Sequence, residues 1–224
     1  MASVLEDALG IEIDYHLCLG LDAIEKMVDA VKGIEINVPV DMNYSDNEQG
    51  LYIDLKAGKQ ILDGKNAVKF LRYRSGYVTG DLGRVDAQKL FLNAFASRIA
   101  SVGNPFALYN VFKLVCDNSE TNVKVNDLIS IAVKCVKAKN GKASYMTAPG
   151  EAIQSEKSGA WYYILSAPSM SELLQSRFDM RESFDKNNRF VDKNAKAFND
   201  IYNKSCDIKI YTADDIENNK ININ

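Results

Sequence analysis

The order of hydrophobic patterns near the start of the chain limits the fold most. Residues 11–19 read as a strand, and residues 22–32 carry apolar side chains at helical spacing. Residues 34–39 form a second strand that ends at Pro39. A strand, a helix and a strand in this order predict a crossover unit of an α/β sheet.

The rest of the chain continues this mixture. A polar loop is expected at 41–50, and further strands are predicted at 51–55, 143–148, 160–166 and 206–212. Helices are predicted at 3–9, 63–70, 84–101, 105–116, 125–137, 170–178 and 195–203. The segment 84–101 is the longest amphipathic helix among them.

Size and charge limit the partners. The chain has 224 residues, a length that allows one generous domain or two small ones. Its net charge is −3. An acidic balance excludes a general attraction to nucleic acid or anionic lipid, so an anion site must come from local clustering. No apolar run approaches the roughly 20 residues that cross a bilayer, so we expect no membrane span in this chain.

Histidine and cysteine are sparse. His16 is the only histidine, and the four cysteines show no CxxC spacing. This argues against a zinc site and against Ser-His-Asp chemistry. His16 and Cys18 would share one face of a strand. They form either a catalytic pair or, alternatively, a buried thiol beside a polar histidine.

Residues 65–98 hold the most informative cluster of charge. Arg72 and Arg74 share a face if the chain is extended there, and Arg84 and Gln88 share a face of the following helix. The first turn of that helix offers free N–H groups and the positive end of its dipole. Guanidinium groups that meet there suit the oxygens of phosphate.

Asp81 precedes Arg84 by three residues and has three possible roles. It could cap the helix, hold an arginine in place, or take a proton from an attacking hydroxyl. The alternative interpretation of the whole segment is a helix with solvated basic residues and a capping aspartate. The spacing of these residues alone leaves both interpretations open.

The wider string GLYIDLKAGKQILDGKNAVKFLRYRSGYVTGDLGRVDAQK, residues 50–89, resembles the LytR-CpsA-Psr family of bacterial cell-envelope proteins. The likeness lies in the spaced glycines, the RxR core, and a D-x-GR turn that leads to a glutamine. The upstream residues 10–39 are similar to the family's strand, helix and valine–proline strand. The resemblance covers roughly residues 5–178.

This resemblance implies a fold and an activity. The fold is a three-layer α/β/α sandwich with a mixed central sheet. The activity is transfer of a cell-wall glycopolymer, such as teichoic acid or capsule polysaccharide, from a polyprenyl-pyrophosphate donor to peptidoglycan, with Mg²⁺. It implies work at the outer face of the bacterial membrane, in the cell envelope, by a membrane-anchored parent protein. DNA binding of the kind suggested by the older name transcriptional attenuator is disfavoured, because the charge is acidic and no helix-turn-helix pattern is present.

The resemblance also implies roles for particular residues. The residues that match the pyrophosphate-binding positions are Arg72, Arg74, Arg84 and Gln88. Asp81 and Arg74 match the catalytic positions. Apolar helix residues that either line the lipid pocket or belong to the ordinary core are Phe91, Leu92, Phe95 and Ile99.

Two departures from the family stand out. Ala87 replaces an arginine, and the family's first strands, with their metal-binding carboxylates, have no counterpart before the matched part. The metal ligands therefore remain unknown. The chain is either a shortened form or a natural reduced homologue that binds lipid-linked ligands, or regulates, without catalysis. We expect a domain over 1–178 and an extension over 179–224 that covers exposed sheet edges.

Overall fold

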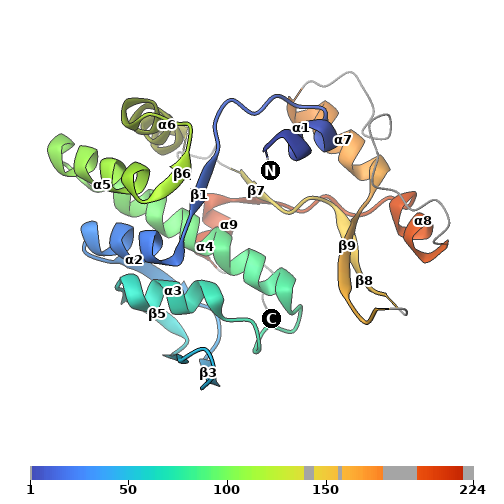
Figure 1. The fold of residues 1–224 in the computed structure, drawn as a ribbon, viewed down its shortest axis with the longest axis horizontal. Helices are drawn as coiled ribbons and strands as arrows, with labels where there is room; N and C mark the ends of the chain where they lie inside the picture. Colours follow the sequence, from blue (N-terminus) through green and yellow to red (C-terminus); the bar gives the residue numbers. More distant parts are fainter. Residues whose placement is uncertain (1, 139–143, 156–157, 179–195, 219–224) are drawn as a thin grey trace. The chain divides into compact units, whose positions relative to one another are not determined.

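The computed structural model describes residues 2–138, 144–155, 158–178 and 196–218 (Figure 1). The chain forms two compact units. We call residues 15–145 and 211–224 the main unit, and residues 1–14 and 146–210 the second unit.

Helices and short strands make up the main unit. Its described helices are α2 (Leu21–Ala30), α3 (Gly64–Arg72), α4 (Asp81–Ala100), α5 (Pro105–Asp117), α6 (Val125–Ala138) and α9 (Ala213–Glu217). Its strands are β1 (Leu17–Leu19), β2 (Ile34–Val38), β3 (Met42–Asp46), β4 (Leu51–Leu55), β5 (Gly58–Leu62) and β6 (Ser119–Thr121).

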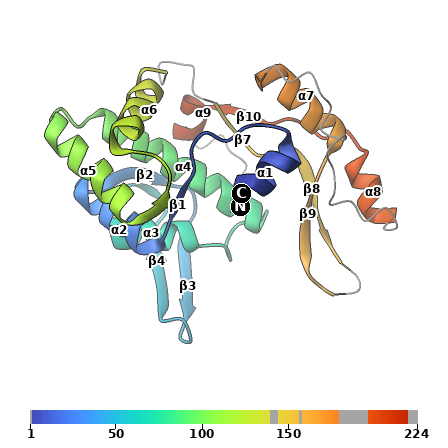
Figure 2. The same ribbon diagram turned by 45° about the horizontal axis from the view of Figure 1, so that its top comes forward.

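Four of these strands form two nested antiparallel pairs. β2 pairs with β5, and within the intervening chain β3 pairs with β4 (Figure 2). Asp41 fixes the junction of the two pairs, because its carboxylate accepts hydrogen bonds from the Ala57 amide at 2.7 Å and from Lys56 Nζ at 3.2 Å. These donors, the amide first, hold the pKa of Asp41 below its ordinary value.

This arrangement corrects two predictions. The segment 41–50 is not all loop, because residues 42–46 gain their strand structure by pairing with β4. The prediction of a crossover unit is also wrong, because β1 and β2 belong to different pairs. β1 has only three residues and pairs antiparallel with the distant β6, whereas β2 pairs with β5. Long-range partners, rather than the local pattern, decide these pairings.

The α/β class itself is confirmed by similarity to solved structures, which are described below with the site. The described strands form five two-stranded sheets, and every pair whose register is described is antiparallel. A mixed central sheet, as predicted, would also contain parallel pairs, and none of the pairs of described register is parallel. The helices agree better, since α5 and α6 begin at the predicted residues and end within one residue of the prediction.

The helix α4 is the central element of the main unit. It packs against β2, α3, α6 and α9. Ala87, where the family resemblance implies an arginine, is fully buried in this core. The same core cluster includes Phe70, Leu90 and Phe91. Burial along a 20-residue helix therefore holds the position of the predicted site residues that α4 carries.

The end of the chain contributes to the same core. Ile216 of α9 is 1% exposed and belongs to the core cluster. Lys89 on α4 forms an ion pair with Asp86 at 2.6 Å, and its ammonium lies 5.4 Å from the ring centre of Tyr211. Residues 211–218 thus pack on α4. The predicted boundary near residue 178 stays a prediction, because residues 179–195 and 219–224 lie outside the described ranges.

The second unit has its own small core. It contains α1 (Ala2–Leu9), the antiparallel pair β8 (Gly150–Gln154) and β9 (Trp161–Leu165), α7 (Ala167–Phe178) and α8 (Lys196–Tyr202). Where the chain passes between the units, β7 (Ser144–Met146) pairs with β10 (Ile210–Thr212). The helix α7 starts earlier than predicted because the Ser166 hydroxyl accepts the Ser169 amide at 3.2 Å. Among the described residues, no helix is long and apolar enough to cross a membrane.

Candidate functional site

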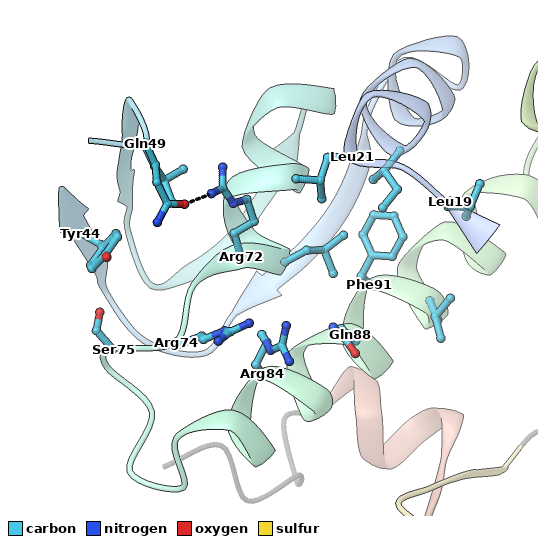
Figure 3. Close-up of a pocket in the computed structure, with 14 residues that line it drawn as sticks. Leu19, Leu21, Tyr44, Gln49, Arg72, Arg74, Ser75, Arg84, Gln88 and Phe91 are labelled. Carbon is cyan, nitrogen blue, oxygen red and sulfur yellow. Dashed lines mark hydrogen bonds between the residues drawn. The ribbon is translucent and has the colours of Figure 1, made fainter. Parts of the chain in front are cut away.

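A cavity of about 860 Å³ opens in the main unit (Figure 3). Its lining includes all four residues predicted to bind pyrophosphate, namely Arg72, Arg74, Arg84 and Gln88. They come from the end of α3, the loop that follows it, and the first two turns of α4. The predicted cluster is therefore brought together in space.

Local sequence explains how Arg72 and Arg74 reach the cavity. The Asp63 carboxylate caps α3 by accepting the Asn66 amide at 2.8 Å, and the helix ends at Arg72. Tyr73 is extended with ψ of 136° and is 4% exposed. A buried, extended residue between the two arginines directs the chain out of the helix, so that both guanidinium groups remain at the cavity.

The start of α4 places the other two residues. Gly80 has φ of +58°, a conformation that side-chain-bearing residues rarely adopt. Gly83 lies so close to Tyr77 that an added Cβ would be 2.5 Å from the Tyr77 Cβ. The buried Tyr77 anchors the loop to the helix, and burial raises the pKa of its phenol.

Asp81 joins two of the arginines. Its carboxylate lies 2.9 Å from Arg84 Nη2 and 3.6 Å from Arg74 Nε. It is the first residue of α4, and the N-cap position is Gly80, with no side-chain cap. Of the three roles considered, capping is therefore not what this carboxylate does here, and holding arginines is.

Two guanidinium groups remain available to a ligand. Arg72 Nη2 donates to Gln49 Oε1, a neutral acceptor, at 2.8 Å. The Arg74 side chain is 61% exposed and contacts Asp81 through Nε at 3.6 Å, whereas Arg84 Nε is buried. The three guanidiniums and the Asp81 carboxylate leave a net charge of plus two beside the N-terminus of a long helix, which is an electrostatic arrangement suited to an anion.

The other end of the cavity is apolar. The apolar residues of the whole lining are Leu19, Leu21, Ile24, Leu51, Leu71, Phe91 and Leu92. Leu21 is 47% exposed and Leu92 is 56% exposed. Figure 3 shows Leu19, Leu21 and Phe91 gathered on one side of the arginines. Exposed leucines at a cavity wall indicate a surface that can bind an apolar ligand.

Only part of the predicted lipid pocket faces this cavity. Phe91 and Leu92 line it, whereas Phe95 and Ile99 do not. Ile99 is 6% exposed in the core, and Phe95 stacks on Phe91 with ring centres 6.2 Å apart. For these two residues the alternative of ordinary core packing describes their position.

Other basic residues of the segment 65–98 serve the fold instead. Lys89 pairs with Asp86, and Arg98 Nε donates to the Val31 carbonyl at 2.7 Å. The thiol of Cys18 is exposed, so the prediction of a buried thiol is wrong; β1 ends after one more residue and leaves this side chain at the surface.

Sequence reasoning missed the contribution of the β3–β4 hairpin. Tyr44 and Gln49 line the cavity next to Ser75, which lies in the loop that sequence reasoning singled out. The missed signal was Gly50, which follows Gln49 with φ of +61° and marks a turn rather than a long loop.

The described residues do not form a magnesium site by themselves. Within the described ranges, no three His, Cys, Asp or Glu side chains gather as metal ligands. Asp81, the carboxylate beside the cavity, already contacts two arginines. The described residues around the cavity therefore supply no set of ligands that would hold Mg²⁺ by themselves.

Comparison with known proteins supports the family resemblance found in the sequence. The profile of the LytR_cpsA_psr family matches residues 1–179. The chain is 30% identical over 128 residues to the polyisoprenyl-teichoic acid–peptidoglycan teichoic acid transferase TagV of Bacillus subtilis (strain 168), covering 57% of this chain and 33% of TagV. It is 24% identical over 189 residues to TagU of Bacillus licheniformis, with 81% and 56% covered.

A solved structure supports the fold. The crystal structure of B. subtilis TagV superposes with a TM-score of 0.67 at 24% identity, covering 81% of this chain and 70% of that one. Since the family profile matches most of the chain, the chain belongs to the LytR_cpsA_psr family. It spans 33% and 56% of the length of the two relatives named above.

Proposed function

We propose that this chain binds a polyprenyl-pyrophosphate-linked glycan and transfers the glycopolymer to peptidoglycan. The observation that carries this proposal is one cavity with two chemically different ends. Arginines and the start of α4 lie at one end, and Leu19, Leu21 and Phe91 lie at the other (Figure 3). A lipid pyrophosphate has the same two parts, an apolar chain and a double anion.

Charge supports the match. A pyrophosphate that joins a lipid to a sugar carries a negative charge on each phosphate, and the cluster of Arg72, Arg74, Arg84 and Asp81 carries a net charge of plus two. The Arg84 side chain is 26% exposed and lines the cavity, so that its charge faces a bound phosphate. Gln88, one turn further along α4, is positioned to donate its amide to the same anion.

The proposed transfer is a displacement at phosphorus. A hydroxyl of the muramic acid acceptor attacks the phosphorus that bears the sugar, and its proton passes to a base. The bond from this phosphorus to the bridging oxygen breaks, and polyprenyl phosphate leaves with that oxygen. Charge grows on the leaving phosphate, and Arg74 and Arg84 would stabilise it. Asp81, which holds both arginines, is the proposed base or their positioning residue.

The partners and place of action follow from this proposal. The donor is a polyprenyl-linked glycan and the acceptor is peptidoglycan, in keeping with the names of TagU and TagV, which are polyisoprenyl-teichoic acid–peptidoglycan teichoic acid transferases. We propose that the chain acts in the cell envelope, at the outer face of the bacterial membrane. Mg²⁺, implied by the family resemblance, is a component of the assay that tests this proposal.

The test is a transfer assay. The chain is incubated with a short polyprenyl-pyrophosphate glycan, a muramic-acid-containing acceptor and Mg²⁺, and released polyprenyl phosphate is measured. We expect release by the wild type and its loss in Arg74→Ala, while Arg177→Ala, an exposed residue of α7 in the second unit, keeps wild-type release. Tight binding of the donor without release would instead support the alternative, a lipid-phosphate-binding module without catalysis.

A further inference from the structure

The cavity has a third part that neither the anion nor the lipid would occupy. Tyr44, Gln49 and Ser75 line it, and Figure 3 shows them on the side of the arginines away from Leu19, Leu21 and Phe91. If the lipid lies over the leucines and the pyrophosphate at the arginines, the group attached to the far phosphate lies against these three side chains.

We propose that the β3–β4 hairpin forms the subsite for the first sugar of the donor, and that this sugar is uncharged. The proposal rests on the proposed function, because it assumes a sugar attached to the pyrophosphate. The lining supplies an aromatic ring, an amide and a hydroxyl. These groups donate and accept hydrogen bonds without carrying charge, which suits the hydroxyl groups of a neutral pyranose.

The hairpin holds these side chains in place. Tyr44 Oη donates to Asp46 Oδ2 at 3.4 Å, and the Gln49 amide N–H donates to Asp46 Oδ1 at 3.0 Å. One carboxylate therefore ties both the ring and the turn. The same carboxylate disfavours an acidic sugar here, since two carboxylates would repel each other.

The subsite is linked directly to the anion site. Gln49 Oε1 accepts a hydrogen bond from Arg72 Nη2 at 2.8 Å, so the turn that carries the sugar-facing groups also contacts the phosphate-facing guanidinium. A sugar-1-phosphate joins the same two positions by one covalent bond. Tyr44, which is 37% exposed, retains surface for a ligand.

Register supplies a matched control within the hairpin. Tyr44 pairs with Ile53, whereas Tyr52 pairs with Ser45. Side chains alternate along a strand, so Tyr52 lies on the opposite face of the hairpin from Tyr44. Tyr52 is 56% exposed and does not line the cavity.

The experiment compares two probes by calorimetry: farnesyl pyrophosphate, and the same lipid pyrophosphate carrying N-acetylglucosamine. We expect Tyr44→Ala to weaken binding of the sugar-bearing probe by about 3- to 10-fold, which corresponds to the loss of about one hydrogen bond. Binding of farnesyl pyrophosphate should change by less than about twofold. Tyr52→Ala should bind both probes as the wild type does.

Three results would overturn the inference. An equal loss for both probes in Tyr44→Ala would make the residue structural, and no loss for either would exclude contact with the sugar. In both cases farnesyl pyrophosphate binding that depends on Arg74 would leave the proposed function standing. If neither probe binds the wild type, the proposed function fails together with the subsite.

Discussion

Arg72 and Gln49 are 23 residues apart in the sequence, and their side chains meet at 2.8 Å across the wall of the cavity. The contact joins the end of α3 to the turn between β3 and β4. Because the acceptor is a neutral amide, it orients the guanidinium without cancelling its charge.

Replacing this acceptor should therefore separate orientation from charge. Gln49→Ala leaves Arg72 charged but untethered, and we expect binding of farnesyl pyrophosphate to weaken by about 3- to 10-fold. Gln49→Glu places a carboxylate against Arg72 and should weaken binding further, because the net charge of the cluster falls. Calorimetry measures both. Gln60→Ala, on β5 and outside the cavity, is the control. Stronger binding by Gln49→Glu would contradict this account.

Asp81→Asn should affect binding and transfer in opposite directions. The variant keeps the shape of Asp81 but removes its charge, so the cluster becomes more positive and lipid pyrophosphate should bind a few-fold more tightly, an effect that weakens with salt. If the carboxylate accepts the proton of the attacking hydroxyl, transfer falls by about 100-fold or more. Transfer that stays at the wild-type rate in Asp81→Asn would exclude the role of base and leave only that of positioning residue.

The sequence predicts this site better than it predicts the sheet around it. Arg84 and Gln88 share a helix face by spacing alone, and both line the cavity. The strand at 51–55 is also predicted with its observed bounds. The partner strand β3 has a polar sequence that predicts a loop, and it becomes a strand by pairing with β4. Gly50 marks the turn beside Gln49, but the place of Gln49 at the cavity depends on the same pairing.

Gly83 should tolerate no side chain. A Cβ there would lie 2.5 Å from the Tyr77 Cβ, and Tyr77 is 5% exposed, so neither atom can move aside easily. We expect Gly83→Ala to lower the free energy of unfolding by about 1–3 kcal/mol. That corresponds to a fall in Tm of several degrees, at about 2–4 °C per kcal/mol for a chain of this size, measured by thermal unfolding.

Gly103 provides the matched glycine control. An added Cβ at Gly103 meets nothing within 4 Å. Gly103→Ala should leave Tm unchanged or raise it slightly, because alanine restricts the unfolded chain. Equal losses in Gly83→Ala and Gly103→Ala would show that close packing on Tyr77 is not what makes Gly83 necessary.

Leu92 tests the apolar end of the cavity. At 56% exposed it contributes little to the core, so Leu92→Asn should fold normally. It should weaken binding of farnesyl pyrophosphate by about 3- to 10-fold, because apolar contact with the lipid is lost, and leave inorganic pyrophosphate binding unchanged. Val78→Asn, at a residue that is 84% exposed and outside the cavity lining, is the control. Equal effects on both ligands would place the lipid elsewhere.

The buried phenol of Tyr77, in the loop before α4, should make the stability of the protein depend on pH in the alkaline range. Burial, and to a smaller degree Tyr73, raises the pKa of the Tyr77 phenol in the folded protein, whereas a tyrosine in the unfolded chain titrates near pH 10. As the pH rises, the unfolded chain therefore releases this proton before the folded protein does. The free energy of unfolding is unaffected by this group below about pH 10, and it falls as the pH rises from there through the folded pKa. Tyr77→Phe should reduce this fall in Tm between pH 9 and 11.

The same substitution has a second expected effect at neutral pH. The Tyr77 hydroxyl is buried and has no hydrogen-bond partner among the described residues, so its removal should leave Tm equal or higher at pH 7. Tyr52→Phe, at an exposed residue whose hydroxyl donates to Asn47 at 2.9 Å, should keep the alkaline decline of the wild type. A large loss of Tm in Tyr77→Phe at pH 7 would mean that the hydroxyl has a partner, such as a bound water, on which the loop and the arginines beside it depend.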